Sequence, residues 1–149
     1  MTSEIQIVMP PHADGTGRLI IAQLMTWVEA AASAEAHRHA RSRQVITAAV
    51  DNLSSFGPAF LDETIRMDAK VIWTGRTSLE VRVDSYAEPA PGKERLINQT
   101  SLLFIALDDK GKPAAISPFK PSTEEEKQEW NKAEERQADR LKARGDIGL

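Results

Sequence analysis

Apolar and polar positions recur with two different periods along this chain. Between residues 19 and 39 the polar residues Gln23, Thr26, Glu29 and Ser33 fall within an arc of about 120° if the segment is an α-helix. The rest of that surface is Leu, Ile, Ala, Met, Val and Trp. A helix that is apolar over so much of its circumference is packed on several sides by other elements. We therefore expect residues 19–39 to form a buried central helix.

Four later segments show the patterns of β-strands. QVITAAV is short and β-branched, and TIRMDAKVIWT and SLEVRVDSY alternate apolar and polar residues with period 2. RLINQTSLLFIAL is apolar on both faces toward its end, as in a central strand. Near the start, EIQIVM predicts a short strand that ends at Pro10-Pro11. One short strand, one helix and four strands predict an α+β fold in which an antiparallel sheet curls around the helix.

The last segment is much more polar than the rest. After Pro121 it reads STEEEKQEWNKAEERQADRLKAR, with Ser122 and Glu125 at the spacing of a capping box and acids preceding bases, as the helix dipole favours. Its narrow apolar seam consists of Trp130, Ala133, Gln137 and Leu141. We expect a charged tail helix that docks in part through Trp130 or contacts another subunit. A fully solvated helix is the alternative.

Composition limits the classes of function. A chain of 149 residues is most simply one domain, and 41% hydrophobic with 28% charged residues is ordinary for a globular protein. The net charge of −3 gives no overall signal for nucleic acid or an anionic membrane. The absence of cysteine excludes disulfides, thiolate metal sites and a cysteine nucleophile. With no signal peptide or apolar stretch of about 20 residues, we expect a cytoplasmic protein that does not enter a membrane.

Few residues carry an obvious chemistry. His37 and His39 lack the i, i+4 spacing that places two ligands on one helix face, so we predict no metal site. The stretch from Asp14 to Arg18, DGTGR, precedes the helix, where free N–H groups favour an oxyanion or a polarised carbonyl. TGRTS at 74–78 places one Arg and two hydroxyls at a turn between strands, which suits either a phosphate or simple solubility.

Four motifs together resemble a known family. The helix segment, then VITAAVD, TGRTSLEV and FIALDDKGKP, are similar in order and content to acyl-CoA thioesterases of the hotdog fold, the group of brain-type acyl-CoA hydrolase and its small bacterial relatives. The resemblance covers about residues 8–119, and the charged tail is similar to the C-terminal helix of longer members. It implies a hotdog domain over residues 1–119, with one central helix inside a curved antiparallel sheet, and a helical tail over 120–149.

The resemblance also implies roles for single residues. Glu29 matches the acid on the central helix of the family, which acts as general base on water or orients it for attack on the thioester carbonyl. Asp14 stands where the family usually has Asn, and an ionised Asp cannot donate a hydrogen bond. Asp14 is the second catalytic candidate, as the group that acts on the water if Glu29 does not. Ile21 and Ala22 stand where the family usually has Gly-Gly, so a β-branched side chain can fill the oxyanion site. These two departures put full activity in question.

The implied substrate is an acyl-CoA, with coenzyme A as part of substrate and product and with no metal or redox cofactor. The residues that the resemblance assigns to coenzyme A are Arg76, Thr77 and Ser78, with Arg43 and Arg18 as weaker candidates for the same anion. The family works as homo-oligomers with a dimer as the minimal unit, and commonly as hexamers. We expect the same here and expect no nucleic-acid partner.

Three functions follow from these observations. The first is hydrolysis of acyl-CoA to free fatty acid and coenzyme A. The second is a non-catalytic or weakly active hotdog protein that binds CoA esters or a nucleotide. The third, a hotdog dehydratase, is disfavoured because its catalytic helix histidine is missing: His37 and His39 lie at the far end of the helix.

Overall fold

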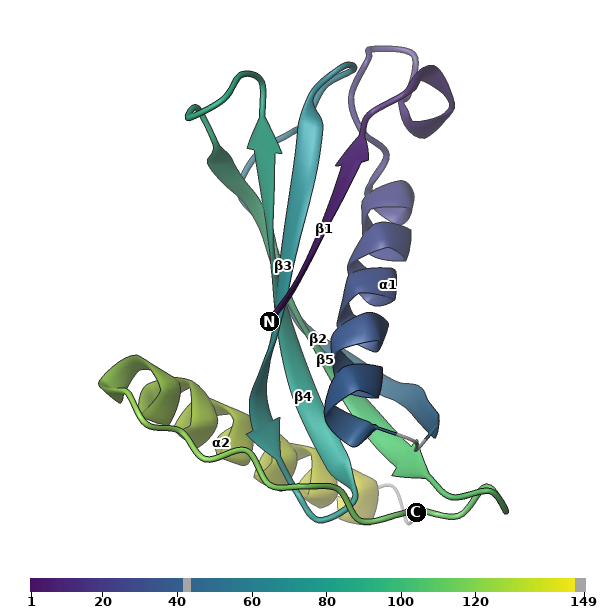
Figure 1. The fold of residues 1–149 in the computed structure, drawn as a ribbon, viewed down its shortest axis with the longest axis vertical. Coiled ribbons are helices and arrows are strands. Elements are labelled where there is room, and N and C mark those ends of the chain that lie inside the picture. The colour runs from purple at the N-terminus through teal and green to yellow at the C-terminus, as the bar shows by residue number, and fades with distance from the viewer. Residues whose placement is uncertain (42–43, 147–149) are drawn as a thin grey trace.

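The computed structural model describes residues 1–41 and 44–146 (Figure 1). In chain order its elements are β1 (Thr2–Ile7), a 3₁₀ turn (Pro10–His12), α1 (Ile21–Ala40), β2 (Gln44–Ser55), β3 (Thr64–Thr74), β4 (Ser78–Glu88), β5 (Arg95–Leu107) and α2 (Glu124–Asp146). The described strands form one sheet in the order β1-β3-β4-β5-β2, and every neighbouring pair is antiparallel. No helix in these ranges is both long and apolar enough to cross a membrane.

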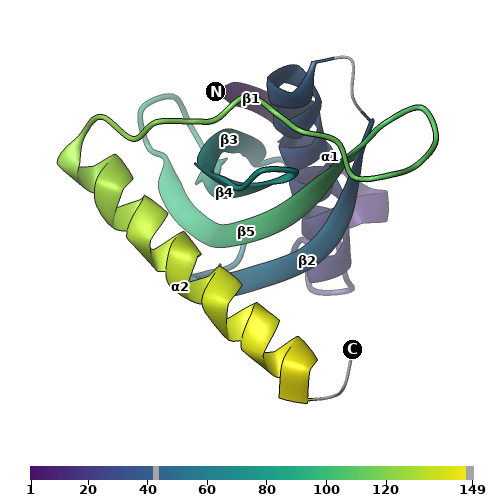
Figure 2. The ribbon, with the colours of Figure 1, turned by 90° about the horizontal axis from the view of Figure 1, so that it is seen from below.

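The sheet curves around α1, while α2 lies against its opposite face (Figure 2). This arrangement confirms the predicted α+β architecture with one central helix and a tail helix. Every second residue of β4 faces α1, and Leu79, Val81 and Val83 are fully buried there. The buried apolar residues of α1 are Leu24, Trp27, Val28, Ala31, Ala32, Ala36 and Ala40. The apolar residues that recur with period 2 in the strands and with period 3.6 in the helix thus form one core between sheet and helix.

Helix α1 is buried on one side only, which corrects the expectation of a helix packed on several sides. Ile21, Ala22, Thr26, Glu29 and Ala30 are exposed, because a single sheet covers the helix in the isolated chain. The exposed stripe of α1 therefore carries both apolar and polar side chains. Apolar side chains exposed together in this way are typical of an interaction site.

The helix also begins two residues later than predicted. The N–H of Leu19 donates to the carbonyl of Ala59 at 2.9 Å, and the N–H of Ile20 donates to that of His12 at 3.0 Å. Ile20 is extended, with φ −72° and ψ 131°, and serves as the N-cap. Long-range backbone hydrogen bonds therefore hold Leu19 and Ile20 outside the helix, although their side chains fit its apolar period.

A β-bulge in β3 interrupts the strict alternation predicted for TIRMDAKVIWT. The pairing with β4 shifts between Val71 and Trp73, so that Trp73 lies opposite Glu80 rather than continuing the face of Ile65 and Met67. Ile72 and Trp73 consequently pack together on the face that carries α2. One extra residue in a strand re-aims the side chains that follow it.

Helix α2 docks on the outer face of the sheet, which confirms the predicted docking and makes the fully solvated alternative wrong. Ala133 is fully buried, and Trp130 packs beside Trp73 with ring centroids 6.1 Å apart. Arg136 donates two hydrogen bonds to the buried carboxylate of Glu80, with the Nε bond at 2.8 Å. Leu141 remains exposed. Ion pairs therefore contribute to this interface alongside a short apolar seam.

The cap of α2 lies one residue later than predicted. The N–H of Glu126 donates to the hydroxyl of Thr123 at 3.1 Å, and the carboxylate of Glu126 accepts from the N–H of Ser122 at 3.3 Å. The predicted pair Ser122 and Glu125 is thus replaced by Thr123 and Glu126. The run of three glutamates allows either spacing, so the sequence alone did not decide between them.

Candidate active site

Glu29 lies on the exposed stripe of α1, a little more than two turns from the start of the helix. The hydroxyl of Thr47, on the facing strand β2, donates a hydrogen bond to its Oε1 at 3.2 Å. This long bond engages one carboxylate oxygen and leaves the other available to a ligand or to water. The structure therefore holds a carboxylate in a defined orientation at the boundary between the central helix and an edge strand.

Thr47 was not singled out as a site residue in the sequence. It belongs to VITAAVD, a segment that had only indicated a strand and a resemblance. In β2 it lies opposite Phe104, on the side of the sheet that faces α1. The available signal was a hydroxyl residue within the apolar stretch VITAAV. Its partner became clear only when β2 was placed beside α1.

Asp14 organises the loop that leads into α1. Its Oδ1 accepts hydrogen bonds from the Thr16 hydroxyl at 2.7 Å, the Thr16 N–H at 2.8 Å and the Arg18 N–H at 3.2 Å. The hydroxyl bond and the two backbone bonds hold the pKa of Asp14 below its ordinary value. Gly17 completes this turn with φ +81°, a conformation that favours glycine. Asp14 is therefore ionised at neutral pH, and its Oδ2 makes none of these bonds.

The first turn of α1 presents unpaired backbone donors. Ile20 supplies no side-chain cap, and within the described ranges the N–H groups of Ile21 and Ala22 have no hydrogen-bond acceptor. The dipole of a 20-residue helix adds partial positive charge at this end. The side chain of Ile21 is half exposed and points away from the core of its own chain. The two N–H groups can therefore stabilise an oxyanion despite the absence of Gly-Gly.

The turn between β3 and β4 contains Arg76, Thr77 and Ser78. The carbonyl of Arg76 accepts from the N–H of Ile116 at 3.1 Å, while its side chain is exposed. Glycine is required at position 75, because a Cβ there would lie 2.7 Å from the Trp73 ring and 3.0 Å from the Ser78 hydroxyl. The tight turn thus displays one guanidinium beside two hydroxyl residues, a set of donors that suits a phosphate.

The predicted anion-binding residues do not all lie together within one chain. Arg18 forms a bridge with Phe60 near the start of α1. Arg76 lies at the other end, where His39 in the last turn of α1 contacts the carbonyl of Ser117 at 2.7 Å. Arg43 lies outside the described residues. Among the candidates that the structure describes, only Arg76, Thr77 and Ser78 lie together in one protomer.

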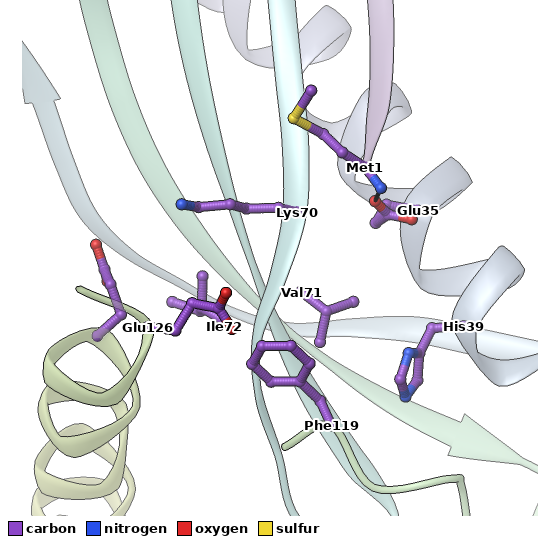
Figure 3. A pocket seen from close by; sticks show the side chains of 9 residues that line it. Met1, Glu35, His39, Lys70, Val71, Ile72, Phe119 and Glu126 are labelled. Carbon is purple, nitrogen blue, oxygen red and sulfur yellow. Dashed lines mark ion pairs between the residues drawn. The ribbon is translucent and has the colours of Figure 1, made fainter. Parts of the chain in front are cut away.

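A cavity of about 330 Å³ lies between the C-terminal half of α1, β3 and the first turns of α2 (Figure 3). Its walls include Glu35, His39, Lys70 and Phe119. Glu35 is 6% exposed, and its carboxylate lies 3.2 Å from the amine of Met1. Glu29 does not line this cavity. The carboxylate of the candidate site and the cavity are therefore separate features.

Comparison with known proteins decides the family. The Thioesterase superfamily matches residues 17–91, which include α1, the Thr47–Glu29 pair and the 74–78 turn. The chain belongs to the thioesterase superfamily. It is 34% identical over 134 residues to YkhA of Bacillus subtilis, named an uncharacterized acyl-CoA thioester hydrolase, covering 89% of this chain and 77% of that one. This membership confirms the resemblance seen in the sequence.

Solved thioesterases share the whole fold. The acyl-CoA hydrolase of Bacillus cereus superposes with a TM-score of 0.89 at 27% identity, covering 98% of this chain and 89% of that one. A hexameric acyl-CoA thioesterase superposes with a TM-score of 0.87 at 29% identity, covering 95% and 91%. An acyl-CoA hydrolase of Staphylococcus aureus, solved with butyryl coenzyme A and coenzyme A, has a TM-score of 0.85 at 27% identity, covering 97% and 91%. These coverages include the docked tail helix.

Proposed function

We propose that this protein hydrolyses acyl-CoA thioesters to free acid and coenzyme A. The observation that carries the proposal is the carboxylate of Glu29, oriented by Thr47 on the exposed face of the central helix. The relatives named acyl-CoA thioester hydrolase, and the solved relative with butyryl coenzyme A, support the substrate class. The reaction requires water, a base and hydrogen-bond donors for the developing oxyanion, and it needs no metal or redox cofactor.

In this mechanism Glu29 accepts the proton of the attacking water, and Thr47 keeps its carboxylate in place. The N–H groups of Ile21 and Ala22 stabilise the negative charge on the carbonyl oxygen. The thiolate of coenzyme A then leaves with the proton returned from Glu29, so the proton balance closes within the site. Asp14, ionised and engaged with its own loop, shapes the entrance to the helix rather than donating a hydrogen bond.

The spacing of site residues in a solved relative supports these roles. In the hydrolase of Staphylococcus aureus, alanine variants were made at an Asn and an Asp fifteen positions apart, and at a Thr seventeen positions after that Asp. In this chain Asp14 and Glu29 are also fifteen positions apart, and Thr47 follows Glu29 by eighteen. A carboxylate and a threonine therefore recur at nearly the same spacing, with Glu29 in place of Asp and Asp14 in place of Asn.

The proposal includes coenzyme A contacts and oligomerisation. Arg76, Thr77 and Ser78 bind phosphate and pantetheine, with Arg18 and Arg43 as weaker candidates for the same anion. The exposed apolar residues in and next to β2 and the start of α1 are Ile20, Ile21, Ile46, Val50, Leu53 and Phe56. A free edge strand beside such a surface favours pairing with a second copy. We propose a dimer as the minimal unit and a hexamer as the full assembly, as in the hexameric relative.

Release of coenzyme A across a panel of acyl-CoA chain lengths tests the proposal. The chain has no cysteine, so a thiol reagent detects only the product. Turnover of any acyl-CoA that depends on Glu29 supports it. Binding of CoA esters without turnover would instead establish the non-catalytic alternative, for which the ionised Asp14 is the structural argument. The cytoplasmic location remains a prediction.

A further inference from the structure

The hydrogen bond between Thr47 and Glu29 depends on the position of β2. Within the described residues this strand pairs only with β5. Its register shifts twice, between Thr47 and Ala49 and again between Asp51 and Ser54. Asn52, in the second irregularity, has a left-handed φ of 51°. Bulges interrupt the ladder of hydrogen bonds, so the segment that carries Thr47 is held less firmly by its own sheet than the central strands are.

Helix α2 holds this segment from the opposite face. Ala49 packs against the apolar cluster that includes Ala133 of α2. Two residues further along β2, the carboxylate of Asp51 pairs with the guanidinium of Arg140, and both side chains are partly buried. A cavity of about 200 Å³ lies beside Asn52, between α2 and the outer face of β2, β4 and β5. The pair is therefore a polar contact between β2 and α2. Figure 2 shows α2 on the outer side of the sheet, where it passes β2.

We infer that Arg140 is a positioning residue for thioester hydrolysis: by holding Asp51 it fixes the part of β2 that presents Thr47 to Glu29. The inference rests on the proposed function. The hydrogen bond to Glu29 is 3.2 Å long, longer than the roughly 2.5–3.0 Å usual between two oxygens, so a small displacement of β2 breaks it. Catalytic groups lose much of their effect when they move by about 1 Å. The tail helix thus contributes to catalysis without touching the substrate.

The first test compares charge reversals on α2. Arg140→Asp should lower kcat about tenfold and leave KM for an acyl-CoA within about twofold, because Glu29 loses its orientation while the coenzyme A contacts remain. The double variant Asp51→Arg with Arg140→Asp restores the pair with reversed charges and should recover most of kcat. Lys142→Asp makes the same change of charge at an exposed position of α2 and should leave kcat unchanged. Arg140→Gln is the milder substitution if Arg140→Asp does not fold.

The second test separates positioning from general stability. In a Thr47→Val background, Arg140→Asp should lower kcat no further, since both changes remove the same hydrogen bond. Equal effects in both backgrounds, or an Arg140→Asp enzyme as active as Lys142→Asp, would overturn the inference alone. A wild-type protein that turns over no acyl-CoA would overturn the proposed function and this inference with it. The rate of hydrogen exchange at the backbone amides of residues 47–50 should rise in Arg140→Asp and stay at the wild-type value in Lys142→Asp.

Discussion

The ion pair between Glu80 and Arg136 makes a quantitative prediction about the tail helix. Glu80 is fully buried under α2, and both of its described hydrogen bonds come from Arg136 to Oε1. Its Oε2 has no partner among the described residues. Arg136→Met keeps the length and apolar stem of the side chain but removes the charge and the donors. It leaves a buried carboxylate without compensation.

The burial of Glu80 sets the size of the expected loss in unfolding free energy. Removing one partner of a buried ion pair costs about 3–5 kcal/mol of unfolding free energy. For a chain of this size each kcal/mol lowers Tm by about 2–4 °C, so a fall of roughly 10 °C is expected. Replacing both residues, as Glu80→Met with Arg136→Met, removes the buried charge as well. That double variant should be close to wild type or more stable.

The loss should depend on pH. Burial raises the pKa of Glu80 above its ordinary value, and the hydrogen bonds and charge of Arg136 oppose that rise. Without Arg136 the pKa rises further, so the folded state retains a proton that the unfolded chain releases. Stability of the variant then falls as pH rises from the ordinary value of 4.5 through the folded pKa. Arg136→Met should be closer to wild type at pH 5 than at pH 8.

Thermal unfolding followed by circular dichroism at both pH values, at fixed protein concentration, measures these differences. A Tm for Arg136→Met within about 2 °C of wild type at pH 8 would refute the reasoning, since no buried carboxylate would then depend on Arg136. A double variant as unstable as the single one would refute it as well. The loss would then arise from packing of α2 and not from the unpaired charge.

Four further predictions concern the site and the assembly. Glu29→Gln should lower kcat about 10²-fold or more with little change in KM, as measured by thiol release; an unchanged kcat would exclude Glu29 as the base. Arg76→Ala should weaken coenzyme A binding by about 1–3 kcal/mol in calorimetry, and equal affinity would reject that contact. Hydrogen bonds from Thr16 lower the pKa of Asp14, so the loop from Asp14 to Arg18 should stay ordered at neutral pH. The loop should loosen as the pH falls below about 4 and through that lowered pKa. The NMR signal of the Thr16 amide should then shift, and an unchanged signal would contradict these hydrogen bonds. Val50→Lys should dissociate the proposed dimer in light scattering, and an unchanged mass would place the interface elsewhere.

Much of the fold was determined by the sequence. The order of strands and helix followed from local periods, because an element with one apolar face must bury that face wherever it sits. β4 shows this most directly, since the alternation of Leu79, Val81 and Val83 predicted its buried face. The family resemblance rested on motifs that recur in linear order. It also pointed to Glu29, which no period could have distinguished from a solvated helix edge.

What remained depended on contacts between distant residues. The pairing of Thr47 with Glu29 joins positions eighteen apart on different elements, and no local pattern encodes that distance. The start of α1 was set by hydrogen bonds from Leu19 and Ile20 to other segments. The bulge at Ile72 places Trp73 on the face that carries α2. The ion pairs of Glu80 with Arg136 and of Asp51 with Arg140 help to dock the charged tail helix on the sheet. Hydrophobic periods show only that one face of an element is buried. Strand register, bulges and ion pairs form when the chain brings separate segments together, and these contacts determined which residues pack against each face.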